Sequence, residues 1–177
     1  MTTIVRGNDH NVRQQISEAL AALEARAATL EGRADVYAYK SSDQTLIGTA
    51  FADVTSTGLA VAANQAYWFE FQIIAEADAT TTGIDIAVNG PAGFSNIQYV
   101  QRYWTSATAV TITRAATYDA NTASTNSAGT AQAIYSCEGI LINGATAGTL
   151  IARIKREAVG SGPNARAGSF GRLRKLT

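Results

Sequence analysis

A series of short segments in which apolar and polar side chains alternate constrains the fold more than any other feature. In residues 67–73 one face of the alternating segment is apolar and holds Tyr67, Phe69, Phe71 and Ile73. A period of two is typical of a strand with one buried face, because successive strand side chains point to opposite sides. The same period recurs at 84–88 and 97–103, whose shared faces hold Ile84, Ile86, Val88, Ile97, Tyr99, Gln101 and Tyr103. The sequence therefore predicts a core built from strands.

Turn residues separate these segments from several others. NGPAG follows residue 88, and NGATAG (143–148) predicts a hairpin between 132–144 and 148–157. The polar tract 119–130 predicts an exposed loop, Asp85 is expected to face outward, and Ile140 and Ile142 are expected in the core. Weaker strands are predicted at 35–39, 48–54 and 58–62, and a closing strand at 165–176. Eight to ten short strands with no intervening helix indicate an antiparallel β-sandwich or jelly-roll-like domain over residues 33–177.

One helix is predicted ahead of the strands, over residues 9–32 and after an N-terminal arm of residues 1–8. Asn8 or Asp9 can cap its start and Gly32 can end it. Its apolar residues recur at spacings of four and three, as in a heptad seam, and are Ile16, Leu20, Leu23, Ala27 and Leu30. Two interpretations remain: an amphipathic helix packed on its own domain, or a short parallel coiled coil that joins several copies of the chain. The spacing alone does not choose a trimer over another oligomer.

The charge distribution is uneven although the chain is neutral overall. Residues 151–177 hold seven of the 14 basic side chains and one of the 14 acidic ones. Such a segment can bind nucleic acid, or it can form a positive strand or rim that meets a negative surface on its own neighbours. Because no nucleic-acid-binding signature accompanies it, we expect the second arrangement and no nucleic-acid partner. No stretch approaches the roughly 20 apolar residues of a membrane span, so we expect no membrane partner.

The residues that carry chemistry are few and scattered. The chain has one histidine, His10, and one cysteine, Cys137, which lies in an apolar run and is expected to be buried. This composition gives no basis for a Ser-His-Asp or Cys-His arrangement, and the carboxylates are unclustered. We therefore expect no enzymatic activity, no metal and no cofactor. A calcium loop is possible at Asp119, Asn121 and Asn126, although their spacing matches no known motif. The aromatic residues Trp68, Tyr103 and Trp104 form either a sugar-stacking platform or part of the packed core.

Four pieces of sequence, taken in order, carry a resemblance to a known class of domain. They are NQAYWFEFQI, TTTGIDIAVNGPAG, EGILINGATAGTLIARI and ARAGSFGRLRKL. Over roughly residues 60–177 the chain resembles a β-sandwich domain of tailed-bacteriophage virion proteins. Such domains occur in capsid decoration proteins, head fibres and tail fibres, commonly as trimers. The resemblance implies a virion context, with synthesis in the cytoplasm of a bacterial host.

From these features we expect a non-enzymatic virion structural protein, a homotrimer that serves as a capsid decoration or head-fibre protein. The alternatives are a tail-fibre or receptor-binding component that recognises host surface glycans, and a glycan-binding module unrelated to phages. The N-terminal residues are too few to fold alone and are expected to order on binding another virion protein, the major capsid protein. The residues assigned to this attachment are Thr3, Ile4, Val5 and Arg6.

Overall fold

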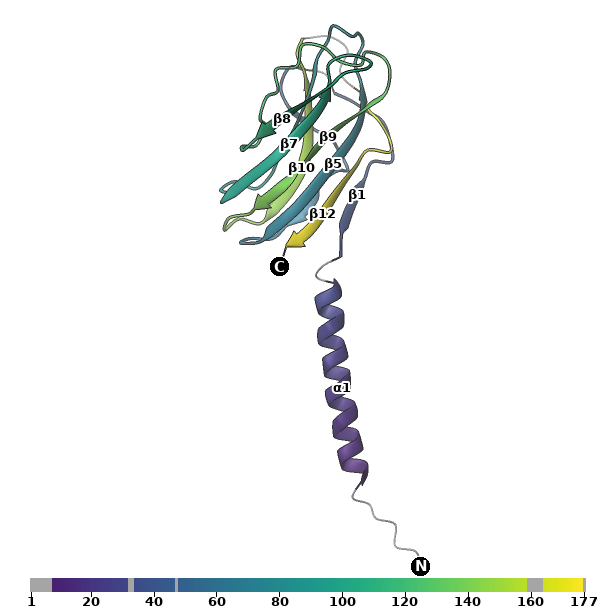
Figure 1. The fold of residues 1–177 in the computed structure, drawn as a ribbon, viewed down its shortest axis with the longest axis vertical. Coiled ribbons are helices and arrows are strands. Elements are labelled where there is room, and N and C mark those ends of the chain that lie inside the picture. The colour runs from purple at the N-terminus through teal and green to yellow at the C-terminus, as the bar shows by residue number, and fades with distance from the viewer. Residues whose placement is uncertain (1–7, 32–33, 47, 159–163, 177) are drawn as a thin grey trace, which may run out of the picture. The chain divides into compact units, whose positions relative to one another are not determined.

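The computed structural model describes residues 8–31, 34–46, 48–158 and 164–176 of the chain. It divides the chain into two compact units, residues 1–34 and 35–177. The first unit contains helix α1 (Asn8–Glu31), which begins and ends one residue earlier than predicted (Figure 1). The capping side chains expected at Asn8 and Asp9, and the terminating Gly32, lie outside the described residues.

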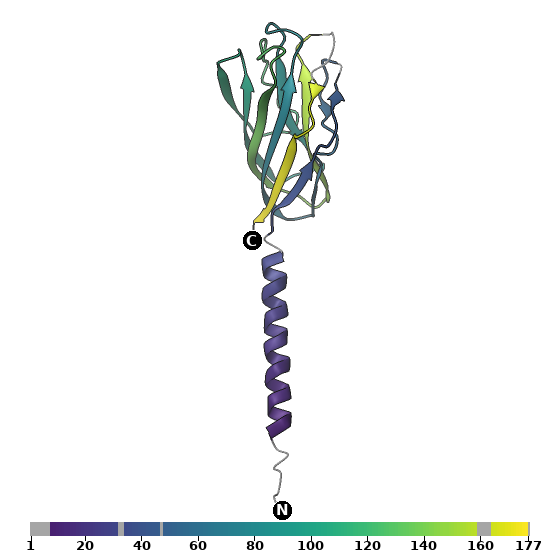
Figure 2. The ribbon, with the colours of Figure 1, turned by 90° about the vertical axis from the view of Figure 1, so that its right-hand side faces the viewer.

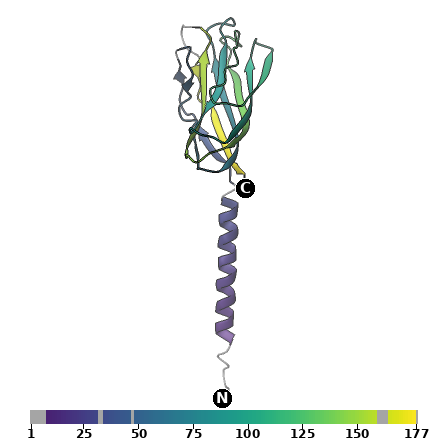
Figure 3. The ribbon, with the colours of Figure 1, turned by 90° about the vertical axis from the view of Figure 1, so that its left-hand side faces the viewer.

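The second unit is a sandwich of two antiparallel sheets. The large sheet contains, in spatial order, β1 (Val36–Tyr39), β12 (Phe170–Leu176), β5 (Ala66–Glu76), β9 (Ala133–Ile142), β7 (Asn96–Trp104) and β8 (Val110–Ala115). The short strand β11 (Asn164–Ala165) pairs with β5, and β2 (Gln44–Thr45) pairs with β11. The small sheet places β10 (Gly148–Arg156) among β3 (Ala52–Asp53), β4 (Leu59–Val61) and β6 (Ile84–Asn89). Figure 2 shows the edge of the large sheet formed by β1 and β12, and Figure 3 the edge formed by β7 and β8. The predicted class, mainly β with one N-terminal helix, is confirmed.

The core lies between the two sheets. The inward residues of β5 and β6 are fully buried, as the alternation predicted, and include Phe69, Phe71, Ile73, Ile84 and Ile86. The inward residues of β10, Leu150, Ala152 and Ile154, lie beside those of β6 in the small sheet and belong to the same core cluster as those of β5 in the large sheet. The ring of Phe69 lies 6.0 Å from that of Phe71 and 6.1 Å from that of Tyr99, in tilted pairs that are favourable for aromatic side chains.

The prediction that Ile140 and Ile142 belong to the core is wrong. Their exposed fractions are 46% and 42%. Cys137 pairs in register with the buried Phe71, so the odd-numbered residues of β9 point inward and the even-numbered ones outward. At the inward position 139 a Cβ would lie 2.4 Å from that of Tyr99, which explains why glycine stands there. The run Ile140-Leu141-Ile142 is apolar on both faces, and alternation alone could not orient it.

The predicted hairpin between residues 132–144 and 148–157 is also wrong. Strand β9 pairs with β5 and β7, whereas β10 pairs with β3, β4 and β6. The NGATAG segment therefore crosses from one sheet to the other. The Asn143 side-chain amide holds this crossing by donating hydrogen bonds to the carbonyls of Ala62 and Thr146, both at 2.8 Å. The crossing puts the apolar inward faces of β9 and β10 on opposite sides of one core.

Asp85 was expected to face solvent, but its exposed fraction is 2%. The polar tract 119–130, expected as an exposed loop, covers the outward side of β6 and buries Ser124 and Ser127. The Asp85 carboxylate accepts hydrogen bonds from the Ser124 backbone N–H at 2.9 Å and from the Thr122 hydroxyl. The Lys155 ammonium lies 3.5 Å from its second oxygen. A buried carboxylate with these partners anchors the loop to the small sheet.

Replacing Asp85 by Ala should destabilise the fold by about 2–4 kcal/mol, because it leaves the Ser124 N–H and the largely buried Lys155 ammonium without their acceptor. Chemical denaturation at one fixed protein concentration measures the effect. Asp53→Ala is the matched control, since the Asp53 side chain is 56% exposed in its ion pair with Arg153 and should change stability by less than about 1 kcal/mol. Equal effects of the two substitutions would contradict the anchoring role of Asp85.

Candidate interaction surfaces

The outward face of the large sheet carries most of the exposed apolar side chains of the sandwich. The exposed large apolar residues on this face are Tyr37, Tyr39, Val110, Ile112, Ile134, Ile140, Ile142 and Leu176. Val36 is also exposed but points to the opposite side of β1, as its pairing with the buried Leu173 shows. None of the small-sheet strands in the described ranges exposes a large apolar side chain. The two outer faces of the sandwich therefore differ in chemistry.

Strand register arranges this face into three bands. The first is mainly apolar and combines Leu176, Trp68, Ile140 and Ile142, with Arg174, Asn96 and Gln98 in the same rows. The second, which we call the charged band, runs across the middle of the sheet and consists of Arg172, Glu70, Glu138, Arg102 and Arg114. The third is apolar again and combines Ile74, Ile134, Trp104 and Val110, while Ile112 lies opposite Arg102 at the border of the charged band.

Most of the charged band is paired internally. Arg172 Nη2 lies 2.8 Å from Glu70 Oε2, and Arg102 Nη1 lies 3.6 Å from Glu138 Oε2. Contact with Tyr37 and the negative charges of Glu70 and Asp35 raise the pKa of Arg172, and these effects outweigh its partial burial. Arg114 is the exception, since it has no ion pair with another described residue.

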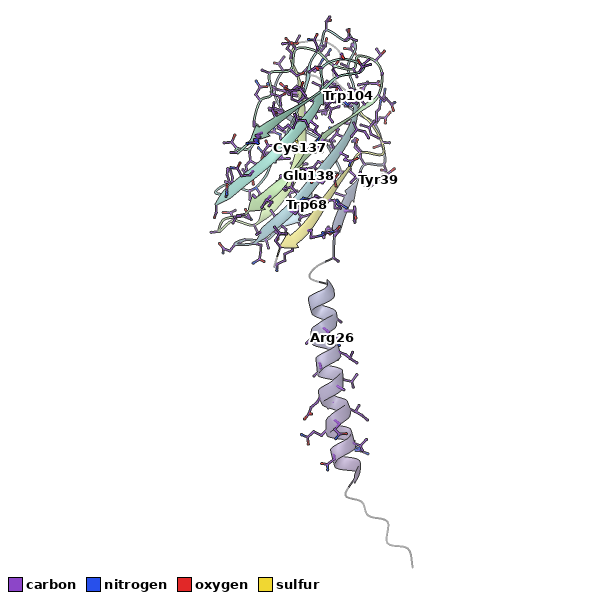
Figure 4. All side chains as sticks on the ribbon, viewed as in Figure 1. Arg26, Tyr39, Trp68, Trp104, Cys137 and Glu138 are labelled. Carbon is purple, nitrogen blue, oxygen red and sulfur yellow. The ribbon has the colours of Figure 1, made fainter. Side chains whose placement is uncertain are left out.

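A hollow of about 520 Å³ lies between the first apolar band and the charged band. Its lining includes Trp68, Gln98, Arg102, Arg114, Glu138 and Ile140. Figure 4 shows the neighbouring positions of Trp68 and Glu138 on the central strands, with Trp104 farther along the sheet. The Arg172 guanidinium carbon lies 4.5 Å from the centre of the Trp68 ring, so it covers one face of the indole.

The three aromatic residues considered as a sugar-stacking platform do not come together. Tyr103 points into the core and is 6% exposed, whereas Trp68 and Trp104 are partly exposed on the outward face, in different bands. The alternative, that these are packing residues, holds for Tyr103 in the core and for Trp104, which is partly buried against the core cluster, but not for Trp68. The Trp104 indole N–H donates to the Ile134 carbonyl at 2.9 Å, which fixes its ring on the outward face.

Helix α1 presents a second apolar surface. Ile16, Leu20 and Leu23 are 53–60% exposed, and Ala27 on the same side is exposed as well. Val12, one turn before Ile16, extends the strip and was not assigned to it from the sequence. The side chain of Leu30 and the attachment residues Thr3, Ile4, Val5 and Arg6 lie outside the described residues. Within the described part of the chain, no helix has the length and apolar character needed to cross a membrane.

The basic C-terminal segment pairs with carboxylates of the same chain, as expected. Its ion pairs join Arg153 to Asp53 and Asp119, Lys155 to Asp85, Arg156 to Asp78, Arg166 to Asp43 and Glu76, Arg172 to Glu70, and Arg174 to Asp35. The Arg174–Asp35 pair is bidentate, with N–O distances of 2.6 and 3.0 Å, and this hydrogen bonding lowers the pKa of Asp35. The positive charge of the segment is thus largely neutralised within the sandwich.

Those positions considered for catalysis or metal binding that the structure describes have other partners or are buried. Burial raises the pKa of the Cys137 thiol, which keeps it protonated and unreactive. Asp119 is engaged by Arg153 and by the Asn89 amide at 2.7 Å, and Asn121 Oδ1 accepts from the Ala123 N–H at 2.9 Å. In the described ranges no three His, Cys, Asp or Glu side chains are grouped as metal ligands would be. The side chain of His10 lies outside the described residues.

Comparison with known proteins gives faint similarities. No protein-family model and no curated protein matches the chain. Among solved structures, the VP2 subviral particle of infectious bursal disease virus is similar at 8% identity and a TM-score of 0.23, over 81% of this chain and 41% of that chain. The structure of the Gx strain of the same virus is similar at 5% identity and a TM-score of 0.21, over 81% of this chain and 36% of that chain. The structure of the Gt strain is similar at 8% identity and a TM-score of 0.22, over 81% of this chain and 42% of that chain. The chain spans less than half the length of these chains, and values this low place it in no family.

Proposed function

We propose that the chain is a non-enzymatic structural protein of a virus particle, a homotrimer attached to the particle by its N-terminal part. The observation that carries this proposal is the exposed apolar seam of α1, with Ile16, Leu20 and Leu23 at heptad spacing. A helix gains most of its stability from packing an apolar face, so a 24-residue helix with such a seam needs a partner. Further copies of the same helix fit the seam in a parallel coiled coil.

The virion context and the trimeric state are supported by the resemblance of residues 60–177 to sandwich domains of tailed-phage virion proteins. The chemistry of the sandwich fits a structural role, because its outer surfaces offer apolar contacts and internally paired charges. The helix is about 36 Å long at 1.5 Å per residue, which suits a short stalk rather than a long shaft. We therefore favour capsid decoration or a head fibre, bound to the major capsid protein, over a component that spans a long distance.

Deletion of residues 2–12 tests the attachment. The truncated chain keeps the seam from Ile16 onward and should remain a folded trimer, but it should no longer bind particles that lack the native protein. Co-sedimentation with such particles measures binding, and circular dichroism and mass measurement check fold and assembly. The matched control keeps the length and replaces Thr3, Ile4, Val5 and Arg6 by Gly and Ser, which should abolish binding equally. Full binding by the truncated chain would place attachment in the sandwich instead.

A receptor-binding component that recognises host surface glycans is the second candidate. The observation in its favour is the hollow beside Trp68, where an indole ring and polar side chains line one concavity. The Trp68→Ala variant distinguishes this candidate from the structural role. If the chain binds host glycans, the variant should occupy particles at full copy number, but those particles should no longer adsorb to host cells. Normal adsorption of such particles favours the structural role.

A further inference from the structure

We infer that the outward face of the large sheet is an interface between copies of this chain. Within the described residues of the sandwich, every exposed large apolar side chain lies on a strand of the large sheet, whereas an incidental scatter would place some on the small sheet. Isolated exposed apolar residues are normal, but apolar side chains gathered on one face, here in two bands on either side of the charged band, are typical of an interaction site. The inference rests on the proposed function only in requiring that several copies assemble.

The size of the face matches what a stable contact between chains needs. Six strands spaced about 4.8 Å apart, with outward residues over about nine positions, give a footprint of roughly 24 by 27 Å, or about 650 Å². The accessible area of a corrugated face is larger than its footprint. A standard protein–protein interface buries about 800 Å² on each partner. The face therefore has room for one such interface, and its hollow can accept projecting side chains such as Ile112 or Tyr39.

The charges on the face favour a second copy over a partner with a strong charge of one sign. The charged band carries both signs, with the acidic Glu70 and Glu138 adjacent in register and arginines on either side. The internal pairs Arg172–Glu70 and Arg102–Glu138 lower the cost of removing the band from water. Glu138 is held by Arg102 only at 3.6 Å and its side chain is 38% exposed, so Glu138 of a second copy can approach Arg114, which lacks an ion pair with another described residue.

The chain itself links this face to the helix. Only residues 32–35 separate the end of α1 from β1, the edge strand of the large sheet. Such a connection spans at most about 17 Å. When the helices of several copies associate, their large sheets are held close at an effective concentration of about millimolar, and a weak contact between sheets then forms readily. The helix seam and the sheet face can thus act as two parts of one assembly.

The test uses the full chain with Ile112 and Ile140 both replaced by Lys. Both side chains are exposed, so the fold should be retained, which circular dichroism and a thermal melt check. Thr149→Lys, on the exposed side of β10 in the small sheet, is the matched control. Sedimentation over a concentration series gives the dissociation midpoint. Acrylamide quenching of fluorescence gives an independent readout, because the only two tryptophans of the chain, Trp68 and Trp104, both lie on this face.

We expect the double variant to dissociate at a concentration at least about tenfold higher than wild type and the control. We also expect dilution through the wild-type midpoint to raise quenching of the tryptophans. An unchanged midpoint together with concentration-independent quenching overturns the inference. Leu23→Asp in the helix separates the two proposals. If Leu23→Asp abolishes assembly and Ile112→Lys/Ile140→Lys does not, the helix seam is the interface and the sheet face is rejected. If Ile112→Lys/Ile140→Lys abolishes assembly and Leu23→Asp does not, the sheet face is the interface and the helix seam is rejected. A wild-type chain that stays monomeric at tens of micromolar rejects both.

Discussion

Leu23→Asp is expected to raise the concentration at which the trimer dissociates by at least about a thousandfold. Leu23 lies in the middle of the seam and is 60% exposed on the helix. In a trimer its three copies would form one layer at the axis, and the substitution would place three carboxylates there. Burying an unpaired charge costs several kcal/mol, and like charges at short distance add repulsion. Sedimentation equilibrium at micromolar concentrations measures the shift.

The matched control for this substitution is Ala22→Asp. Residue 22 is exposed and lies one position away from the seam, so the same carboxylate would remain in solvent. It should leave the dissociation midpoint within about threefold of wild type. Assembly of the Leu23→Asp protein at wild-type concentrations would show that the seam is dispensable, and the sheet face would then be the first place to look for the interface.

Phe71→Ala has the largest expected effect on the fold itself. Phe71 is fully buried, and its ring packs against Phe69 on one side and against Gly171 on the next strand, where a Cβ would come within 2.6 Å of the ring. Removing a large buried side chain forfeits its burial and leaves a cavity, at a cost of about 3–5 kcal/mol. Chemical denaturation measures this cost at a fixed protein concentration, because assembly also contributes to stability.

Phe170→Ala is the comparison for Phe71→Ala. Phe170 lies on the outward face of the same sheet and is only partly buried, opposite Gln72 in register. The same atoms are removed, but no closed cavity is left, so the loss should be less than about 2 kcal/mol. A cost below about 1 kcal/mol for Phe71→Ala would mean that the core is not organised around β5.

Alternation predicted the inward faces of β5, β6 and β7 because polar residues there mark the outward side clearly. It failed at Ile140 and Ile142, where both faces of β9 are apolar and only pairing with Phe71 sets the orientation. It failed at Asp85 because a loop distant in sequence, 119–130, covers that side of the sheet. In both places a contact remote in sequence decides which side of the strand is buried, and no local pattern contains that information.

The two candidate surfaces differ in how far the sequence could predict them. The helix seam is local, since all its residues lie within 15 positions of one element, and its heptad spacing is visible in the sequence. The sheet face combines residues from six strands, each of which contributes only a few side chains. Register alone brings Trp68, Ile140 and Gln98 side by side. In the sequence, the run Ile140-Leu141-Ile142 indicates that the outward side of β9 is apolar as well as the inward side, and its residues Ile140 and Ile142 were wrongly assigned to the core.

The most direct test of the account is the mass of the wild-type chain in solution. Native mass spectrometry or sedimentation equilibrium at about ten micromolar should give roughly 55 kDa, three times the 18.5 kDa of the chain. This mass should persist on dilution into the low micromolar range, because helix seam and sheet face both contribute to assembly. A single species of 18.5 kDa at that concentration would contradict the proposed trimer, and with it the role assigned to both apolar surfaces.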